Sequence, residues 1–224
     1  MRWYKRERSG VLEGNPFREE IEGAGRLARV NYSLDLVIDE RCEVVFASRD
    51  EPPSPFRECV GVASDMYVRE VEGPYDLVVA YADPLDMDLY QATKALEHAA
   101  AVAAEGGVII IVAKCPGGFG NQEFETDAKM GGEKLEELVE ERRFRSLVPA
   151  LVALVTKEIC ERHEVYLLTQ AELQGVEGPK IIRRLPDTFR AGRRVLIIRR
   201  RALQRQPSGR VVASHVARRV SPQL

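Results

Sequence analysis

The middle of the sequence constrains the fold most, because two buried-strand patterns flank a helical one. Residues 75–81 (YDLVVAY) and 108–113 (VIIIVA) are nearly continuous apolar runs, which are typical of strands buried on both faces of a sheet. Between them, residues 89–104 are rich in alanine and other helix formers, and Gly106 and Gly107 predict the end of that helix. A strand, a crossover helix and a second strand form a βαβ unit, so we expect a parallel sheet.

The flanking segments extend this unit. Asn15, a good N-cap, precedes Pro16 and predicts a helix from Pro16 to about residue 29. Two short β-branched runs, 31–39 and 42–48, predict a hairpin. The remaining predicted elements are helices over 56–71, 132–145 and 147–162, and strands over 164–168 and 194–198.

These elements predict an α/β fold with a mixed, mainly parallel, Rossmann-like sheet and helices on both faces. With 224 residues, the chain has room for one full-sized domain of this kind. We expect a linker or N-terminal extension over 1–14, one α/β domain over 15–198, and a basic, disordered tail over 199–224.

Composition excludes several classes of protein. The longest apolar runs reach about a third of the roughly 20 residues that span a membrane, so we expect no membrane association. The four cysteines are far apart and lack Cys-x-x-Cys spacing, which argues against a zinc ribbon or a disulfide scaffold and favours the cytoplasm.

The charge is distributed unevenly along the chain. Residues 180–224 contain 13 Lys or Arg residues and one acid, Asp187, although the whole chain has a net charge of −2. A basic segment after an acidic body indicates contact with nucleic acid or docking on the body itself. It lacks the interleaved aromatic residues on which single-strand binders stack bases, which argues against a nucleic-acid partner.

A ligand crevice is predicted at the carboxyl ends of the two central strands. The loops 83–88 and 114–120 follow these strands, and the helix that begins near Leu89 is expected to point free N–H groups and a partial positive charge at them. An anion such as a carboxylate or phosphate is the expected ligand. Tyr90, Gln91 and Lys94 share one side of this helix and are candidates to hold the oxygen atoms of a small acid. Alternatively, Lys94 is a solvated surface lysine and Gln91 an ordinary first-turn residue.

The glycine loop 114–120 leaves two interpretations open. Gly117, Gly118 and Gly120 would let the backbone approach a ligand closely, or they form a tight turn. Their spacing fits neither a dinucleotide-binding fingerprint nor a Walker motif. Cys115, beside Lys114, is either a thiol of lowered pKa or, more in keeping with its position at a strand end, a buried structural cysteine.

The three histidines, His98, His163 and His215, have no metal-ligand spacing, so we expect no metal site within the chain. No Ser-His-Asp order or Gly-x-Ser-x-Gly elbow is present in the sequence either.

Four segments resemble a known family. Residues 10–20 (GVLEGNPFREE), 34–46 (LDLVIDERCEVVF), 88–94 (DLYQATK) and 106–120 (GGVIIIVAKCPGGFG) are similar to the C-terminal domain of the lactate racemase (LarA-like) family, and the resemblance extends over about residues 10–198. This family comprises 2-hydroxyacid racemases and epimerases that use a nickel-pincer nucleotide. The resemblance implies that residues 15–198 are that C-terminal domain, working by hydride transfer through an α-keto acid.

The resemblance also implies roles for individual residues. It makes Gln91 and Lys94 catalytic, with Lys94 holding substrate oxygens electrostatically as charge develops. The expected substrate- and cofactor-binding residues are Tyr90, Asp86, Lys114, Gly117, Gly118 and Gly120.

The resemblance covers only the C-terminal domain of the family. In the family, the N-terminal domain supplies the nickel ligand, the covalent tether to the cofactor, and the acid and base. The resemblance therefore implies an N-terminal-domain partner, in cis or in trans, that mainly holds the cofactor. It further implies an exposed apolar face where this domain docks, and an isolated chain without activity. Two alternatives stay open: a non-catalytic module that binds a small carboxylate or nucleotide, and an interaction protein that uses the basic tail.

Overall fold

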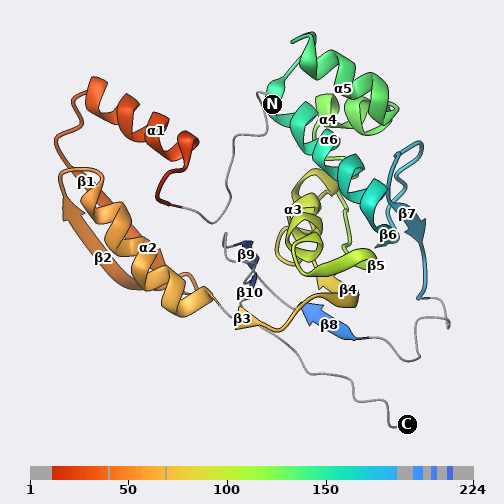
Figure 1. Ribbon diagram of the computed structural model, residues 1–224, viewed down its shortest axis with the longest axis horizontal. Helices are drawn as coiled ribbons and strands as arrows, with labels where there is room; N and C mark the ends of the chain where they lie inside the picture. Colours follow the sequence, from red (N-terminus) through yellow and green to blue (C-terminus); the bar gives the residue numbers. More distant parts are fainter. Residues whose placement is uncertain are drawn as a thin grey trace. The chain divides into compact units, whose positions relative to one another are not determined.

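The computed structural model describes residues 12–39, 41–68, 70–185, 194–198, 203–205 and 211–213 (Figure 1). The chain divides into two compact units, one formed mainly by residues up to Glu70 and the other mainly by residues 71–203. The range 15–198, which the sequence analysis treats as one domain, thus contains parts of both units. Most of the predicted extension 1–14 and of the predicted tail 199–224 lies outside the described residues.

The first unit consists of a helix, a hairpin and a second helix. These are α1 (Pro16–Leu27), β1 (Ser33–Ile38), β2 (Val44–Asp50) and α2 (Ser54–Tyr67). The Asn15 side chain accepts a hydrogen bond from the Phe17 N–H at 3.1 Å, as the predicted N-cap requires. β1 and β2 pair antiparallel, so the predicted hairpin is confirmed, and α2 contacts both strands.

The second unit is built on a parallel sheet of five strands in the order β7-β6-β5-β4-β8. Its strands are β4 (Tyr75–Tyr81), β5 (Ala103–Val112), β6 (Glu164–Leu168), β7 (Lys180–Ile182) and β8 (Val195–Ile198). Its helices are α3 (Leu89–Ala100), α4 (Gln122–Ala128), α5 (Gly132–Glu140) and α6 (Leu147–Arg162). Three short strands, β3 (Glu70–Val71), β9 (Leu203–Arg205) and β10 (Val211–Ala213), form a separate sheet in the order β3-β10-β9.

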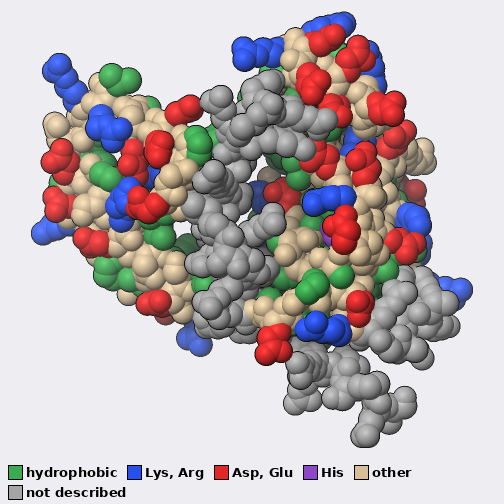
Figure 2. All heavy atoms as spheres, in the orientation of Figure 1, with side chains coloured by type: hydrophobic (Ala, Val, Ile, Leu, Met, Phe, Trp, Pro, Cys, Tyr) green, Lys and Arg blue, Asp and Glu red, His purple; other side chains and the backbone are tan. Residues whose placement is uncertain are grey.

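The predicted α/β class is confirmed: the second unit is a parallel sheet flanked by helices. α3 contacts β4 and β5, α6 contacts β6, and the two helices contact each other, so they share one face of the sheet. Successive right-handed crossovers that step in one direction along a sheet explain this, because they place their helices on the same side. Figure 2 shows acidic and basic side chains interspersed over the solvent side of this helical layer.

The core of the second unit lies between the sheet and its helices. Val78, Ile109 and Leu167 on the strands are at most 2% exposed, as are Ala92 and Ala99 on α3. The hairpin of the first unit is antiparallel, whereas the five-stranded sheet of the second unit is parallel throughout.

The predicted end of the central helix is wrong. α3 stops at Ala100, and residues 103–107 already belong to β5, whose register with β4 shifts between Tyr75 and Leu77. Gly106 has φ +68°, so it permits an irregularity within the strand. The sequence analysis also missed α4, which is capped by the Asn121 side chain accepting from the Phe124 N–H at 2.8 Å.

Candidate functional site

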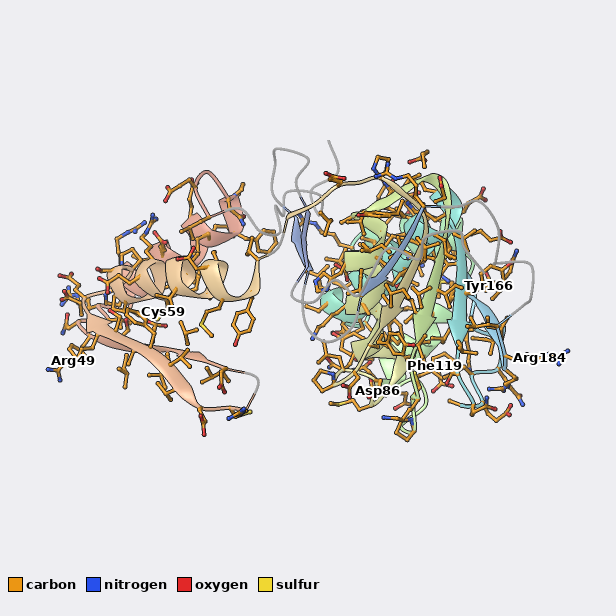
Figure 3. The ribbon with its side chains drawn as sticks, turned by 90° about the horizontal axis from the view of Figure 1, so that it is seen from below. Arg49, Cys59, Asp86, Phe119, Tyr166 and Arg184 are labelled. Atoms are coloured by element: carbon orange, nitrogen blue, oxygen red, sulfur yellow. The ribbon has the colours of Figure 1, made fainter. Side chains whose placement is uncertain are left out.

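The two loops predicted to line a crevice are bound directly to each other. The Cys115 N–H donates to the Asp86 carbonyl at 2.8 Å, and the Gly117 N–H donates to the Met87 carbonyl at 2.9 Å. Because β4 and β5 are parallel neighbours, the loops that follow them meet at the same edge of the sheet. Asp86 and Phe119 mark this edge in Figure 3. We call loops 83–88 and 114–120 together the loop platform.

The N-terminus of α3 is closed by the loop platform. The Leu89 N–H donates to the Gly118 carbonyl at 2.9 Å, and the Tyr90 N–H donates to the Phe119 carbonyl at 3.2 Å. The Gln91 N–H donates to the Asp88 carboxylate at 2.8 Å. The expectation of free N–H groups that bind an anion here is therefore wrong, because the glycine loop folds over the helix start and uses them.

The glycines allow this close packing. Gly120 has φ +80°, and a Cβ atom added there would lie 2.2 Å from the Asp88 Cγ atom. A Cβ atom on Gly117 would lie 3.0 Å from the Met87 carbonyl oxygen, whereas one on Gly118, at φ +62°, would meet open space. The geometry supports the tight-turn interpretation of this loop, and ligand contact through the three glycines stays a prediction.

Asp86 and Lys114 form an ion pair across the loop platform. Their Oδ2 and Nζ atoms are 3.2 Å apart, and the Lys114 side chain is 79% exposed. The buried Thr169 hydroxyl, on the loop after β6, donates to the Lys114 carbonyl at 3.0 Å. No sequence pattern points to Thr169, because its partner is 55 positions away. The backbone of Lys114 is thus fixed while its ammonium group faces solvent.

Three predicted site residues lie on the first turns of α3, outside its buried face. Tyr90 packs its ring against Phe124 of α4, with ring centroids 5.2 Å apart. Lys94 is exposed, and its Nζ atom donates to the Gln91 Oε1 atom at 2.7 Å. The buried face consists of Leu89, Ala92, Thr93, Leu96 and Ala99. At 100° per residue, Gln91 and Lys94 lie on the side of the helix turned away from the sheet.

His98 lies on α3, one turn beyond Lys94. Burial, and to a smaller extent the charge of Lys94, lowers the pKa of His98 to about 4. The imidazole is therefore neutral at physiological pH beside the charged Lys94.

Cys115 is a buried structural cysteine. Its side chain is fully buried, and burial raises the pKa of the thiol to about 11, with Asp88 and Asp86 acting in the same direction. The interpretation of Cys115 as a thiol of lowered pKa is therefore wrong.

Metal ligands do not gather in the part of the chain that the structure describes: it holds no group of three or more His, Cys, Asp or Glu side chains that could bind an ion. Within the same residues, every helix is too short or too polar to cross a bilayer.

Comparisons with known proteins find similarity that includes most of the second unit. Residues 72–181 match the family model of the lactate racemase C-terminal domain. A lactate racemase of Thermoanaerobacterium thermosaccharolyticum is 28% identical over 172 residues, covering 74% of this chain and 40% of the relative. A lactate racemase of Lactiplantibacillus plantarum is 24% identical over 166 residues, covering 72% of this chain and 39% of the relative. The chain therefore spans about 40% of the length of these curated relatives.

Solved structures agree with this fold. The apoprotein of the Thermoanaerobacterium thermosaccharolyticum lactate racemase superposes with a TM-score of 0.72 at 24% identity, over 80% of this chain and 45% of that one. A protein from Thermotoga maritima superposes with a TM-score of 0.55 at 20% identity, over 78% of this chain and 48% of that one. At these identities the likeness shows the fold alone. Residues 72–181 of this chain thus resemble the lactate racemase C-terminal domain.

Proposed function

We propose that this chain is the C-terminal part of a nickel-pincer-nucleotide-dependent racemase or epimerase of lactate-type 2-hydroxy acids, which works by hydride transfer. The observation that carries the proposal is the family match over residues 72–181, a range that includes α3 and the loop platform. Two curated lactate racemases align over most of the chain and support the same substrate class.

In this proposal Lys94 and Gln91 are the catalytic residues. An ammonium group has three N–H donors, and the hydrogen bond to Gln91 accounts for one of them while fixing the direction of the side chain. The other donors would bind the carboxylate or the developing oxyanion of the substrate. Because both side chains lie on the side of α3 turned away from the sheet, substrate would approach from there.

The loop platform would position the proposed catalytic residues. It fixes the first turn of α3, and with it Gln91, through the Asp88 cap and the carbonyl groups of the glycine loop. Packing against Phe124 holds the Tyr90 ring beside the proposed catalytic pair. Substrate or cofactor binding by Tyr90, Asp86, Lys114, Gly117, Gly118 and Gly120 belongs to this proposal as well.

The described residues do not fit a nickel site, since they bring no three metal ligands together. The cofactor would therefore be held mainly by the polypeptide that corresponds to the rest of the relatives, in cis or in trans. When bound, it would supply the hydride acceptor for the α-carbon. The isolated chain would then be inactive.

The proposed location of the protein is the cytoplasm. It is supported by the four cysteines, which are all free thiols, as is usual in a reducing compartment.

A reconstitution experiment tests the proposed function. The portion of the Thermoanaerobacterium thermosaccharolyticum enzyme that precedes its C-terminal domain, loaded with the nickel cofactor, is mixed with this chain, and L-lactate racemisation is followed by chiral chromatography. Removing one preorganised donor typically lowers kcat by about 10²–10³-fold, so we expect a loss of this order for Lys94→Ala. Lys134→Ala, which removes an exposed lysine paired with Glu137, serves as the control and should keep full activity.

No racemisation by the assembled wild-type pair, or equal activity of Lys94→Ala and Lys134→Ala, would refute the proposal. The alternative of a carboxylate- or nucleotide-binding module predicts instead that the isolated chain binds lactate or a nucleotide in calorimetry. The closed N-terminus of α3 argues against that alternative. The other alternative is an interaction protein that uses the basic tail, residues 199–224. Most of these residues lie outside the described part of the chain.

A further inference from the structure

The β1–β2 hairpin exposes an apolar surface. On β1, the alternate residues Leu34, Leu36 and Ile38 are 61%, 50% and 40% exposed. On β2, Val44 lies opposite Ile38 in the register and is 56% exposed. Alternate residues of a strand point to the same side, so these four side chains form one surface, which we call the hairpin apolar face.

The other side of the hairpin is already packed. Val37 and Ser48 are 5% and 8% exposed and point toward α2, where Cys59 is buried. The Ser48 hydroxyl donates to the Glu58 carboxylate of α2 at 2.7 Å. Figure 3 shows α2 along this side of the ribbon, with Cys59 between helix and strands. The ribbon therefore has one covered side, and its second side carries branched aliphatic residues in contact with solvent.

An exposed apolar face of this kind is expected to contact another polypeptide. An isolated two-stranded ribbon is at most marginally stable in water, and contiguous exposed aliphatic side chains mark interaction sites. Arg49, which pairs with Leu34 in the register, is exposed and places a charge at one border of the face. An apolar centre with a charged border is typical of a protein–protein interface.

We infer that the hairpin apolar face is the docking surface for the polypeptide that corresponds to the part of the lactate racemases that this chain does not span; this inference rests on the proposed function. The curated relatives are more than twice as long as the part of them that aligns. The hairpin precedes residue 72, where the C-terminal domain match begins. Along the sequence of a relative, the equivalent segment would lie between the C-terminal domain and the rest of the enzyme.

The relatives also share sequence with this chain beyond that domain. Their alignments, over 172 and 166 residues, are longer than the matched range 72–181. Because Leu34, Leu36, Ile38 and Val44 are aliphatic, the docked polypeptide would present an aliphatic surface to them.

A binding experiment without cofactor or substrate tests the inference. The preceding portion of the Thermoanaerobacterium thermosaccharolyticum lactate racemase is titrated with this chain in a calorimeter, and hydrogen exchange is followed over residues 33–50. We expect a complex in which the strands become protected. Leu36→Asp, at the centre of the face, should weaken binding at least tenfold. Val148→Asp is the matched control, because Val148 is 59% exposed on α6, and it should bind like wild type.

Two kinds of outcome would overturn the inference. Absence of a complex, or a complex that Leu36→Asp leaves intact, would show that this polypeptide does not dock on the hairpin. If sedimentation shows a dimer of this chain that Leu36→Asp dissociates and the partner does not displace, the occupant is a second copy. Far-UV circular dichroism confirms that each variant is folded. A complex without racemase activity would leave the interface intact and refute the proposed function alone.

Discussion

Substitution of Gly120 by alanine tests whether the loop platform fixes the start of α3. Gly120 has φ +80°, and its added methyl group would lie 2.2 Å from the Asp88 Cγ atom and 2.6 Å from the Asp88 Oδ1 atom. Asp88 is the N-cap of α3, so it must move and release the Gln91 N–H. The variant therefore combines backbone strain with loss of a helix cap.

The two effects can be separated by a second glycine. A left-handed conformation costs a residue with a Cβ atom about 1–2 kcal/mol, and this applies to Gly120→Ala and Gly118→Ala alike. An added Cβ atom at Gly118 meets open space, so the cap is kept there. Loss of an N-cap costs about 0.5–2 kcal/mol. We expect Gly120→Ala to lower the free energy of unfolding by about 1.5–4 kcal/mol, and by about 0.5–2 kcal/mol more than Gly118→Ala.

Urea unfolding followed by far-UV circular dichroism measures both variants, and hydrogen exchange at the Gln91 amide reports on the cap itself. Equal free energies of unfolding for the two variants, with unchanged exchange at Gln91, would show that the platform does not hold the helix start. In that case the proposed positioning of Gln91 and Lys94 would lose its structural basis.

Three further changes test the electrostatics and packing of the second unit. Because burial lowers the pKa of His98 to about 4 from 6.5, the unfolded chain binds a proton between these pH values that the folded chain does not. Stability should fall as pH drops through this window, by at most about 3.5 kcal/mol at about 1.4 kcal/mol per pKa unit. The urea midpoint of His98→Gln should therefore change less between about pH 7 and about pH 5 than the wild-type midpoint does. Lys114→Ala should change the free energy of unfolding by less than about 1 kcal/mol, since the Lys114 side chain is 79% exposed in its pair with Asp86; a larger loss would show a buried role. Thr169→Val leaves the Lys114 carbonyl without its donor and should destabilise the protein by about 1–3 kcal/mol in the same assay, and an unchanged midpoint would contradict that contact.

The candidate site could be predicted only in part. Sequence reasoning located the two loops and Tyr90, Gln91 and Lys94, because strand ends and helix starts follow from local patterns. It mistook the function of the helix start, because the acceptors of the Leu89 and Tyr90 N–H groups lie almost 30 residues farther along the chain. Neither propensity nor spacing reveals which distant carbonyl groups will fill a helix terminus.

The sequence by itself determined the βαβ core, the hairpin and the Asn15 cap, since each depends on side-chain periodicity or on a hydrogen bond within a few residues. Tertiary structure decided where α3 ends, because pairing of Ala103 with Tyr75 draws the following residues into β5. It also decided that one side of the hairpin is buried against α2 while Leu36 on the other stays exposed, because alternation only divides a strand into two sides. Which of the two is covered depends on the elements that pack against it.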